Sequence, residues 1–429
     1  MNALADSLWT LVRWAVPVTV AGVFAAGVIG ASRIGDQVRV RVEDRLSKEF
    51  PGLVVKVQAA SLVEGEGIVV RGVSVSDPSL PQQWRQLVSI DEIQLGCSTN
   101  LADLAGGQTR IETVRVRRPL VHAMRRQDGT WSVGPLLTRR PAGTIIPVVV
   151  EDATVLLDDM RLHARMALRQ VDVEVQPVAG EPGHAAIRGS MAADLFDRAT
   201  FQGRFAPAEG GFDLAGDVEG LELSPRMASL VPDDGPRSDE ARAMLSGLRG
   251  RVSLSWRTSG ALASLDQAAF ECRGRLDAGH VEHPRLPLVV SDMRASFAAD
   301  RNGVRIESME AHAGSTLLRG SGRLAGWSAD GDFELLLEAE RLIVGRHWEG
   351  LLPAAVADQW QKLLPAGEVD VRAEVARRRS VLDHRVSVRC RNVSLTHYRF
   401  PYRLDRTIGT IVSQRSEEHT SELQSRQYL

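Results

Sequence analysis

Apolar and polar residues alternate along much of the chain, and this period of two constrains the fold more than any other feature. In VDVEVQP, for example, Val171, Val173 and Val175 alternate with charged or polar residues. Successive side chains of a β-strand point to opposite faces, so such a stretch has one apolar face and one charged face. The pattern is typical of antiparallel strands with one buried and one solvated side. It recurs in GRVSLSWRT, GEVDVRAEV and HRVSVRCRN, which begin at residues 250, 367 and 384.

Turn signals separate these strands. Asp128-Gly129, Glu209-Gly210-Gly211 and Asn302-Gly303 are typical of tight connections. Their spacing predicts about twenty strands between residues 51 and 414. Side by side at about 4.8 Å per strand, these would extend about 90 Å and curl under their own twist. The apolar face of such a sheet must be covered by helices, closed on itself, or used to bind another molecule.

The stretch VRVRRPLVHAMRRQDGTWSV, residues 114–133, is unusually rich in arginine for a strand. Its alternation predicts one apolar and one basic face. Arg118 and Pro119 disturb the alternation, which predicts a β-bulge or a sheet edge there. The predicted apolar face consists of Val114, Val116, Leu120 and Met124, and the basic face of Arg115, Arg117 and Arg125.

Two helical segments interrupt the strand pattern, at residues 225–248 and 345–364. Each is followed by a glycine and a strand, in LSGLRGRVSLSW and QKLLPAGEVDVRAEV. This similarity suggests an internal repeat of about 117 residues, from Gly250 to Gly367, by which a sheet could grow in units. The alternative is two unrelated surface helices.

The N-terminal region contains an uncharged stretch, residues 14–31, which would span about 27 Å as a helix. We expect residues 1–32 to form an uncleaved membrane anchor; the alternative is a cleaved secretory signal peptide, and both would export the rest of the chain. Residues 33–50, with apolar positions four apart, are expected to form a short amphipathic helix beside the membrane. The anchor residues are Trp14, Val18, Val20, Val23, Phe24, Val28 and Ile29.

The C-terminal stretch RSEEHTSELQS is polar and has no periodicity. It resembles the conceptual translation of a sequencing adapter, so we expect residues 415–429 to be an artefact rather than native sequence. The natural chain would then continue beyond Gln414.

The sequence contains no catalytic motif: a G-x-S-x-G elbow, a Walker A loop and an HExxH helix are all missing. The net charge of −2 gives no basic footprint for nucleic acid. The glycines of GSTLLRGSGRLAGW lack a βαβ context, so phosphate binding is not expected there. We therefore predict a non-enzymatic protein without a cofactor.

Metal sites are not expected either. Cys97, Cys272 and Cys390 lack the spacing of a zinc site or a disulfide framework. HVEH, residues 280–283, is interpreted as a solvated loop, and Asp158-Asp159 as a polar turn.

Three segments together resemble the AsmA-like family of bacterial envelope proteins. The first is the N-terminal span with SLVEGEGIVVRGVSVSDPS, and the second is TRIETVRVRRPLVHAMRRQDGTWSVGPLL, with Pro119 and the D-G-x-W residues Asp128, Gly129 and Trp131. The third comprises LLPAGEVDVRAEV and YRFPYRLDRTIGTIV. The resemblance covers residues 10–160 and 345–412. Between these two ranges the sequence is similar to the family only in its general character.

This resemblance implies a mainly β protein: a transmembrane helix followed by a long, curved, largely antiparallel β-groove with a few short capping helices. It implies an anchor in the bacterial inner membrane, with the bulk of the chain in the periplasm. It also implies a role in moving phospholipid between the inner and outer membranes. A scaffold for outer-membrane protein assembly, acting through strand edges, is the alternative.

The candidate lipid-facing residues follow from the alternation. We expect Val371→Asp or Leu254→Arg to disturb the groove, and Arg372→Ser or Arg389→Ser to be nearly silent. The full set is Val114, Val116, Val171, Val173, Val252, Leu254, Trp256, Val369, Val371, Val386 and Val388.

Overall fold

The computed structural model describes most of the chain from residue 52 to residue 415. The described ranges are 52–63, 67–97, 111–137, 145–161, 164–206, 210–230, 246–261, 267–282, 288–327, 331–351, 360–379, 381–396 and 402–415, with single positions at 39, 40, 43, 44, 47, 50 and 242.

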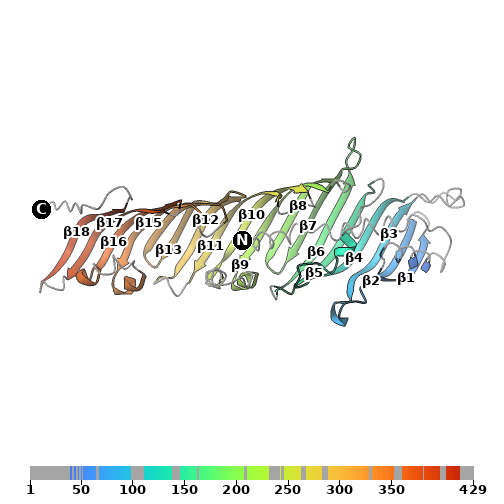
Figure 1. The fold of residues 1–429 in the computed structure, drawn as a ribbon, viewed down its shortest axis with the longest axis horizontal. Helices are drawn as coiled ribbons and strands as arrows, with labels where there is room; N and C mark the ends of the chain where they lie inside the picture. The colour runs from blue at the N-terminus through green and yellow to red at the C-terminus, as the bar shows by residue number, and fades with distance from the viewer. Residues whose placement is uncertain are drawn as a thin grey trace.

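All 18 strands of the described residues belong to one sheet. Their order in the sheet follows their order in the chain, because each strand pairs with the next from β1 to β18 (Figure 1). Among these described strands, only β4 and β5 pair in parallel. The prediction of a mainly β chain with one long, largely antiparallel sheet is confirmed.

The first nine strands cover the N-terminal half of the sheet. They are β1 (Val54–Val63), β2 (Gly67–Ser76), β3 (Gln86–Cys97), β4 (Ile111–Arg125), β5 (Val148–Asp159), β6 (Ala164–Pro177), β7 (Ala185–Ala193), β8 (Phe196–Ala206) and β9 (Gly211–Leu223).

The other nine strands continue the sheet toward the C-terminus. They are β10 (Leu248–Ala261), β11 (Ala269–Val281), β12 (Val290–Asp300), β13 (Gly303–Ala313), β14 (Thr316–Ala325), β15 (Phe333–Val344), β16 (Ala366–Arg378), β17 (Val381–Thr396) and β18 (Arg403–Arg415).

Many strands contain an irregularity at which a residue other than glycine has a positive φ. The register shifts close to several of these residues, as in β5 at Asp152 and in β15 at Arg341. An aspartate on the next strand accepts a hydrogen bond from the displaced backbone N–H in both cases: Asp172 bonds Asp152 at 2.9 Å and Asp370 bonds Arg341 at 3.0 Å. Bulges of this kind bend strands and increase their twist, so a series of them curves the sheet.

The irregularity predicted at Arg118 and Pro119 is present, inside the sheet rather than at its edge. Arg118 has a φ of 46°, and β4 is flanked by β3 and β5. The left-handed residue shifts the alternation by one position. Val121 therefore takes the buried place, and the expectation that Leu120 shares the face of Val114 is wrong: Leu120 is exposed.

Helical turns lie between strands. The segment expected at 225–248 begins with η2 (Pro225–Leu230), and Arg242 and Ser246 are also helical. The segment expected at 345–364 contains η4 (Arg346–Leu351) and a helical turn at residues 360–363. Two shorter elements are η1 (Gln82–Trp84) and α5 (Gly134–Leu137).

The predictions for the two ends fall mostly outside the described residues. Those residues include no helix that is long and apolar enough to cross a membrane. The predicted span at 14–31 and its anchor side chains lie outside them, as do residues 416–429. Of the predicted 33–50 helix, the five described positions from Arg39 to Ser47 are helical, with an ion pair of 3.2 Å between Arg39 and Glu43.

Candidate functional site

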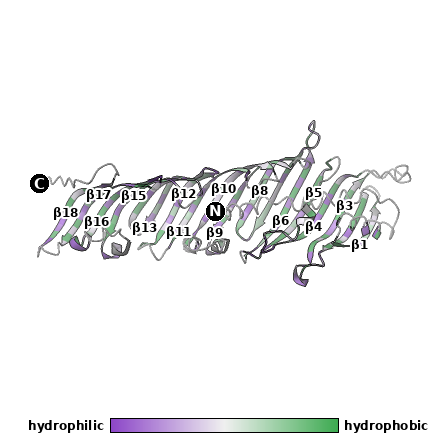
Figure 2. Ribbon diagram, in the orientation of Figure 1, coloured by the Kyte–Doolittle hydropathy of each residue, from purple (hydrophilic) through white to green (hydrophobic). Residues whose placement is uncertain are grey.

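One face of the sheet, here called the apolar face, carries the alternating hydrophobic side chains. Cross-strand partners in a ladder share a face. Val369 opposes Cys390, Val371 opposes Val388, and Ala373 opposes Val386, so these residues lie on the same side. Figure 2 shows hydrophobic and hydrophilic residues alternating along the strands over the whole length of the sheet. The face is nevertheless not uniform along that length.

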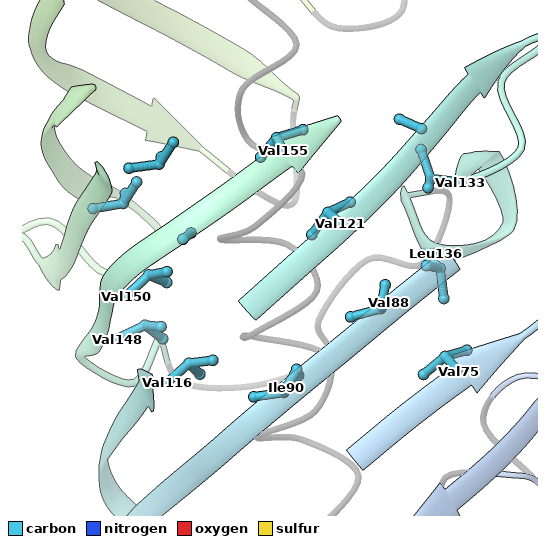
Figure 3. Close-up of a cluster of buried hydrophobic side chains, with 14 of the residues drawn as sticks. Val75, Val88, Ile90, Val116, Val121, Val133, Leu136, Val148, Val150 and Val155 are labelled. Atoms are coloured by element: carbon cyan, nitrogen blue, oxygen red, sulfur yellow. The ribbon is translucent and has the colours of Figure 1, made fainter. Parts of the chain in front are cut away.

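From β1 to β9 the apolar face is filled by its own side chains, and we call this part the closed section. Val114, Val116, Val171 and Val173, all predicted to face a groove, belong to one large buried cluster. Val171 is completely buried. Neighbouring members of this cluster come together from several strands in Figure 3: Val75 on β2, Val88 and Ile90 on β3, Val121 on β4, and Val148, Val150 and Val155 on β5.

The connection after β4 covers part of the closed section, and we call residues 131–136 the covering segment. Val133 and Leu136 are 1% and 0% exposed and belong to the same buried cluster, as does Trp131. In Figure 3, Val133 and Leu136 lie close to Val121 and Val88. The parallel pairing of β4 with β5 explains this path, because the chain must cross over the sheet to start β5 in the same direction.

Hydrogen bonds fix the covering segment to the end of β4. The Ser132 N–H donates to the Met124 carbonyl at 2.8 Å, and the Met124 N–H donates to Ser132 Oγ at 3.0 Å. The preceding turn is held by Asp128, whose Oδ1 accepts from the Thr130 hydroxyl at 2.6 Å and from the Thr130 N–H at 2.8 Å. These bonds from Thr130 hold the pKa of Asp128 below its ordinary value. The Asp-Gly-x-Trp motif therefore shapes the start of the cover.

From β10 to β18 the apolar face is only partly buried, and we call this part the open section. Of its predicted residues, Val252 and Val369 are buried, while Leu254, Trp256, Val371, Val386 and Val388 are half-buried. Ile306 and Leu337 are 37% and 38% exposed. Among the described elements, only neighbouring strands pack extensively against these strands (Figure 1). Trp348 of η4 packs against a small buried cluster of the open section that includes Val369 and Leu342.

The apolar face of the open section consists of uncharged side chains over most of its length. Following the register from β10 to β15, the described positions on the apolar face are hydrophobic or small, with none of them charged. Arg377 on β16 shares this face, opposite Phe333 near the strand end. Its guanidinium donates to the Gly331 carbonyl and lies 5.1 Å from the centre of the Phe333 ring. The charge of Arg377 is thus held near the strand ends, at the edge of the apolar face.

The opposite face of the sheet carries ladders of ion pairs. On the N-terminal strands, Glu92 accepts from Arg71 at 3.0 Å and from Arg117 at 3.2 Å, and Arg117 also reaches Glu151 at 3.2 Å. The hydrogen bond from Arg71 is the main reason that the pKa of Glu92 lies below its ordinary value. Arg372 likewise joins Glu338 and Glu374. Arg115, Arg117 and Arg118 of the 114–133 stretch thus belong to a solvated, charge-balanced surface. The prediction that Arg125 shares this surface is wrong: the bulge at Arg118 puts Arg125 in phase with Val121, and its side chain is only 14% exposed and pairs with Asp159.

The structure corrects two interpretations of polar residues. Asp158 and Asp159 end β5 rather than forming a turn; Arg165 donates to Asp158 at 2.6 Å, and Arg125 donates to Asp159 at 3.3 Å. His280 lies in β11 rather than in a loop, and His283 lies outside the described residues.

Burial raises the pKa values of all three cysteine thiols, and the described residues contain no cluster suited to a metal ion.

Several residues of the open section were not among the predicted site residues. The run of three leucines at 335–337 hides the alternation that places Leu335 and Leu337, but not Leu336, on the apolar face. The covering segment was also missed as part of the site. Its only sequence signal is an apolar stretch after the Asp-Gly turn.

The fold and this face define a class: an elongated single-sheet protein with one apolar and one charged side. Comparison of the sequence with models of known families finds no match, and comparison with curated proteins finds none either.

Proposed function

We propose that this chain is a non-enzymatic protein of the bacterial envelope that binds phospholipid acyl chains along its apolar face. An inner-membrane anchor and a periplasmic location form part of the proposal, and its role is to help lipid pass between the inner and outer membranes. The observation that carries it is the open section: a long, half-exposed hydrocarbon surface on an otherwise charged molecule.

Exposed apolar surface on this scale is unusual in a soluble protein that has no partner for it, and typically marks a binding site. Burying one methylene group is worth about 0.8 kcal/mol. An acyl chain of about sixteen carbons could therefore gain up to about 12 kcal/mol, before ordering costs are subtracted. Such binding needs no specific polar residue, which fits a face of hydrophobic and small residues.

The experiment is extraction of radiolabelled phospholipid from vesicles by the purified full chain. The proposal predicts saturable extraction that an excess of unlabelled phospholipid reduces. Extraction no greater than that by a soluble protein of similar size would refute it.

A second candidate function is assembly of other envelope proteins through strand edges. In the described chain, β18 pairs only with β17, and its other edge is unpaired. This strand exposes apolar side chains, with Ile408 78% and Leu404 61% exposed. An unpaired edge of this kind can add a strand, either from another polypeptide or from further sequence of the same chain. Crosslinking from β18 would then capture a polypeptide, whereas crosslinking from Leu337 would not.

A further inference from the structure

We propose that acyl chains occupy only the open section, β10–β18, and that the covering segment and the filled face behind it keep them out of β1–β9. This inference rests on the proposed function and adds to it the extent of the binding site. Lipid would then be held toward the C-terminal end of the sheet.

The covering segment is built as a fixed barrier. Val133 and Leu136 are buried against the strands below, and both backbone and side-chain hydrogen bonds tie Ser132 to Met124. An acyl chain that followed the face past β4 would have to displace these side chains. Displacing Val133 and Leu136 would expose their apolar surface to water while the acyl chain buries a similar area. The exchange therefore gives no net gain in hydrophobic free energy.

The described strands between the covering segment and β10 are mostly filled as well. On β7 and β8, Ile187, Met191, Phe196 and Phe201 belong to the large buried cluster. At its boundary, Trp256 of β10 opposes Gly216 of β9, and the indole lies directly against this glycine. Trp256 thus fills the space that a β9 side chain would occupy, and it lies where mostly buried side chains give way to mostly half-buried ones.

The open section fits a hydrocarbon chain better than a polypeptide. Its backbone N–H and C=O groups are engaged in the strand ladders, and the described apolar-face side chains from β10 to β15 carry no charge. A polypeptide lying on this face would bury its own backbone polar groups without partners, at a cost that hydrocarbon does not have. Nine strands at about 4.8 Å extend about 40 Å, longer than the roughly 15 Å of one bilayer leaflet. The section can therefore hold a whole acyl chain.

The test is photolabelling of the full chain with a phospholipid that carries a diazirine in its acyl chain, supplied in phosphatidylglycerol vesicles, followed by peptide mass spectrometry. We expect labels on apolar-face residues of the open section such as Leu254, Leu337 and Val371, and at least ten-fold fewer on Val88, Val116 and Val173. Equal labelling of both sections would overturn the inference and leave the proposed function standing. No labelling anywhere would overturn both.

A double variant tests the covering segment itself. Val133→Ala with Leu136→Ala should add labels at Val88 and Val121 without loss of labels at Leu337. Leu168→Ala with Val171→Ala, a deletion of the same size at two other fully buried positions, is the matched control and should leave these positions unlabelled. An unchanged pattern in a folded double variant would show that this segment is not the barrier. If the double variant does not fold, the wild-type labelling map alone decides the extent of the site.

Discussion

The closed and open sections are built from strands with the same alternation, yet their apolar faces end in different states. In the closed section, Val75, Leu95 and Val171 are completely buried. In the open section, Val371, Val386 and Val388 lie at equivalent places and stay half-buried. The difference lies in what fills the space above the face. The closed section has bulkier mutual packing and a crossover segment, whereas the described part of the open section has neither. Periodicity therefore specifies a face, and the connections decide whether that face becomes core or surface.

The largest expected effect is that of a charge in the closed section. Val116→Asp places a carboxylate at a position that is 2% exposed, within the buried cluster. A buried, unpaired charge typically costs several kcal/mol, so we expect a loss of more than about 3 kcal/mol in the free energy of unfolding. Urea denaturation followed by circular dichroism measures it. A loss below about 1 kcal/mol would mean that this face is not a core.

The second largest effect is expected for truncation of a leucine, which should cost more stability in the closed section than in the open section. Leu136→Ala removes a fully buried side chain and should cost about 2–5 kcal/mol. Leu337→Ala removes a side chain that is 38% exposed and should cost less than about 1.5 kcal/mol. The same denaturation assay compares them, and similar losses would contradict the distinction between the sections.

A charge in the open section should affect binding more than stability. Val371 is half-buried, so the carboxylate of Val371→Asp can stay partly hydrated. We expect a loss of about 1–2 kcal/mol in stability, because the hydration is retained in part. Phospholipid extraction from vesicles should fall at least five-fold. Normal extraction by this variant would argue that lipid does not contact β16.

Acid should lower the stability of the fold through protonation of Glu92 on the charged face. The hydrogen bond from Arg71 lowers the pKa of Glu92 from its ordinary value of 4.5. A carboxylate with a lowered pKa in the folded state stabilises the fold above its unfolded pKa, and this contribution is lost as the pH falls through the lowered folded value. The stability advantage of wild type over Glu92→Gln should therefore be constant near neutral pH and shrink below about pH 4.5. An advantage that grows on acidification would contradict this sign.

The smallest effect is expected for Arg372→Ser on the outer face. Arg372 is more than half exposed, and its pairs with Glu338 and Glu374 lie in solvent. Such pairs contribute about 0–1 kcal/mol each and are screened by salt. The change in melting temperature should be close to zero at high ionic strength, and lipid extraction should be normal.

The sequence predicted the strands, the two faces and the charged outer side, because period-two alternation reports directly on side-chain direction. It failed at Leu120: a bulge or edge was predicted at Arg118 and Pro119, but the alternation was continued past it unchanged, whereas the positive φ of Arg118 shifts the alternation by one position. It also did not distinguish Val116 from Val371. Both are valines between charged neighbours, and their burial depends on segments remote in sequence. The covering segment could not be predicted as such, since its role follows from the parallel crossover between β4 and β5.

Native mass spectrometry of the purified full chain tests the central claim most directly. The account predicts that wild type and Arg372→Ser carry a phospholipid-sized mass adduct, and that Val371→Asp carries it at a markedly lower level. No adduct on any of the three proteins, or equal adducts on both variants, would contradict the claim that the apolar face of the open section holds lipid.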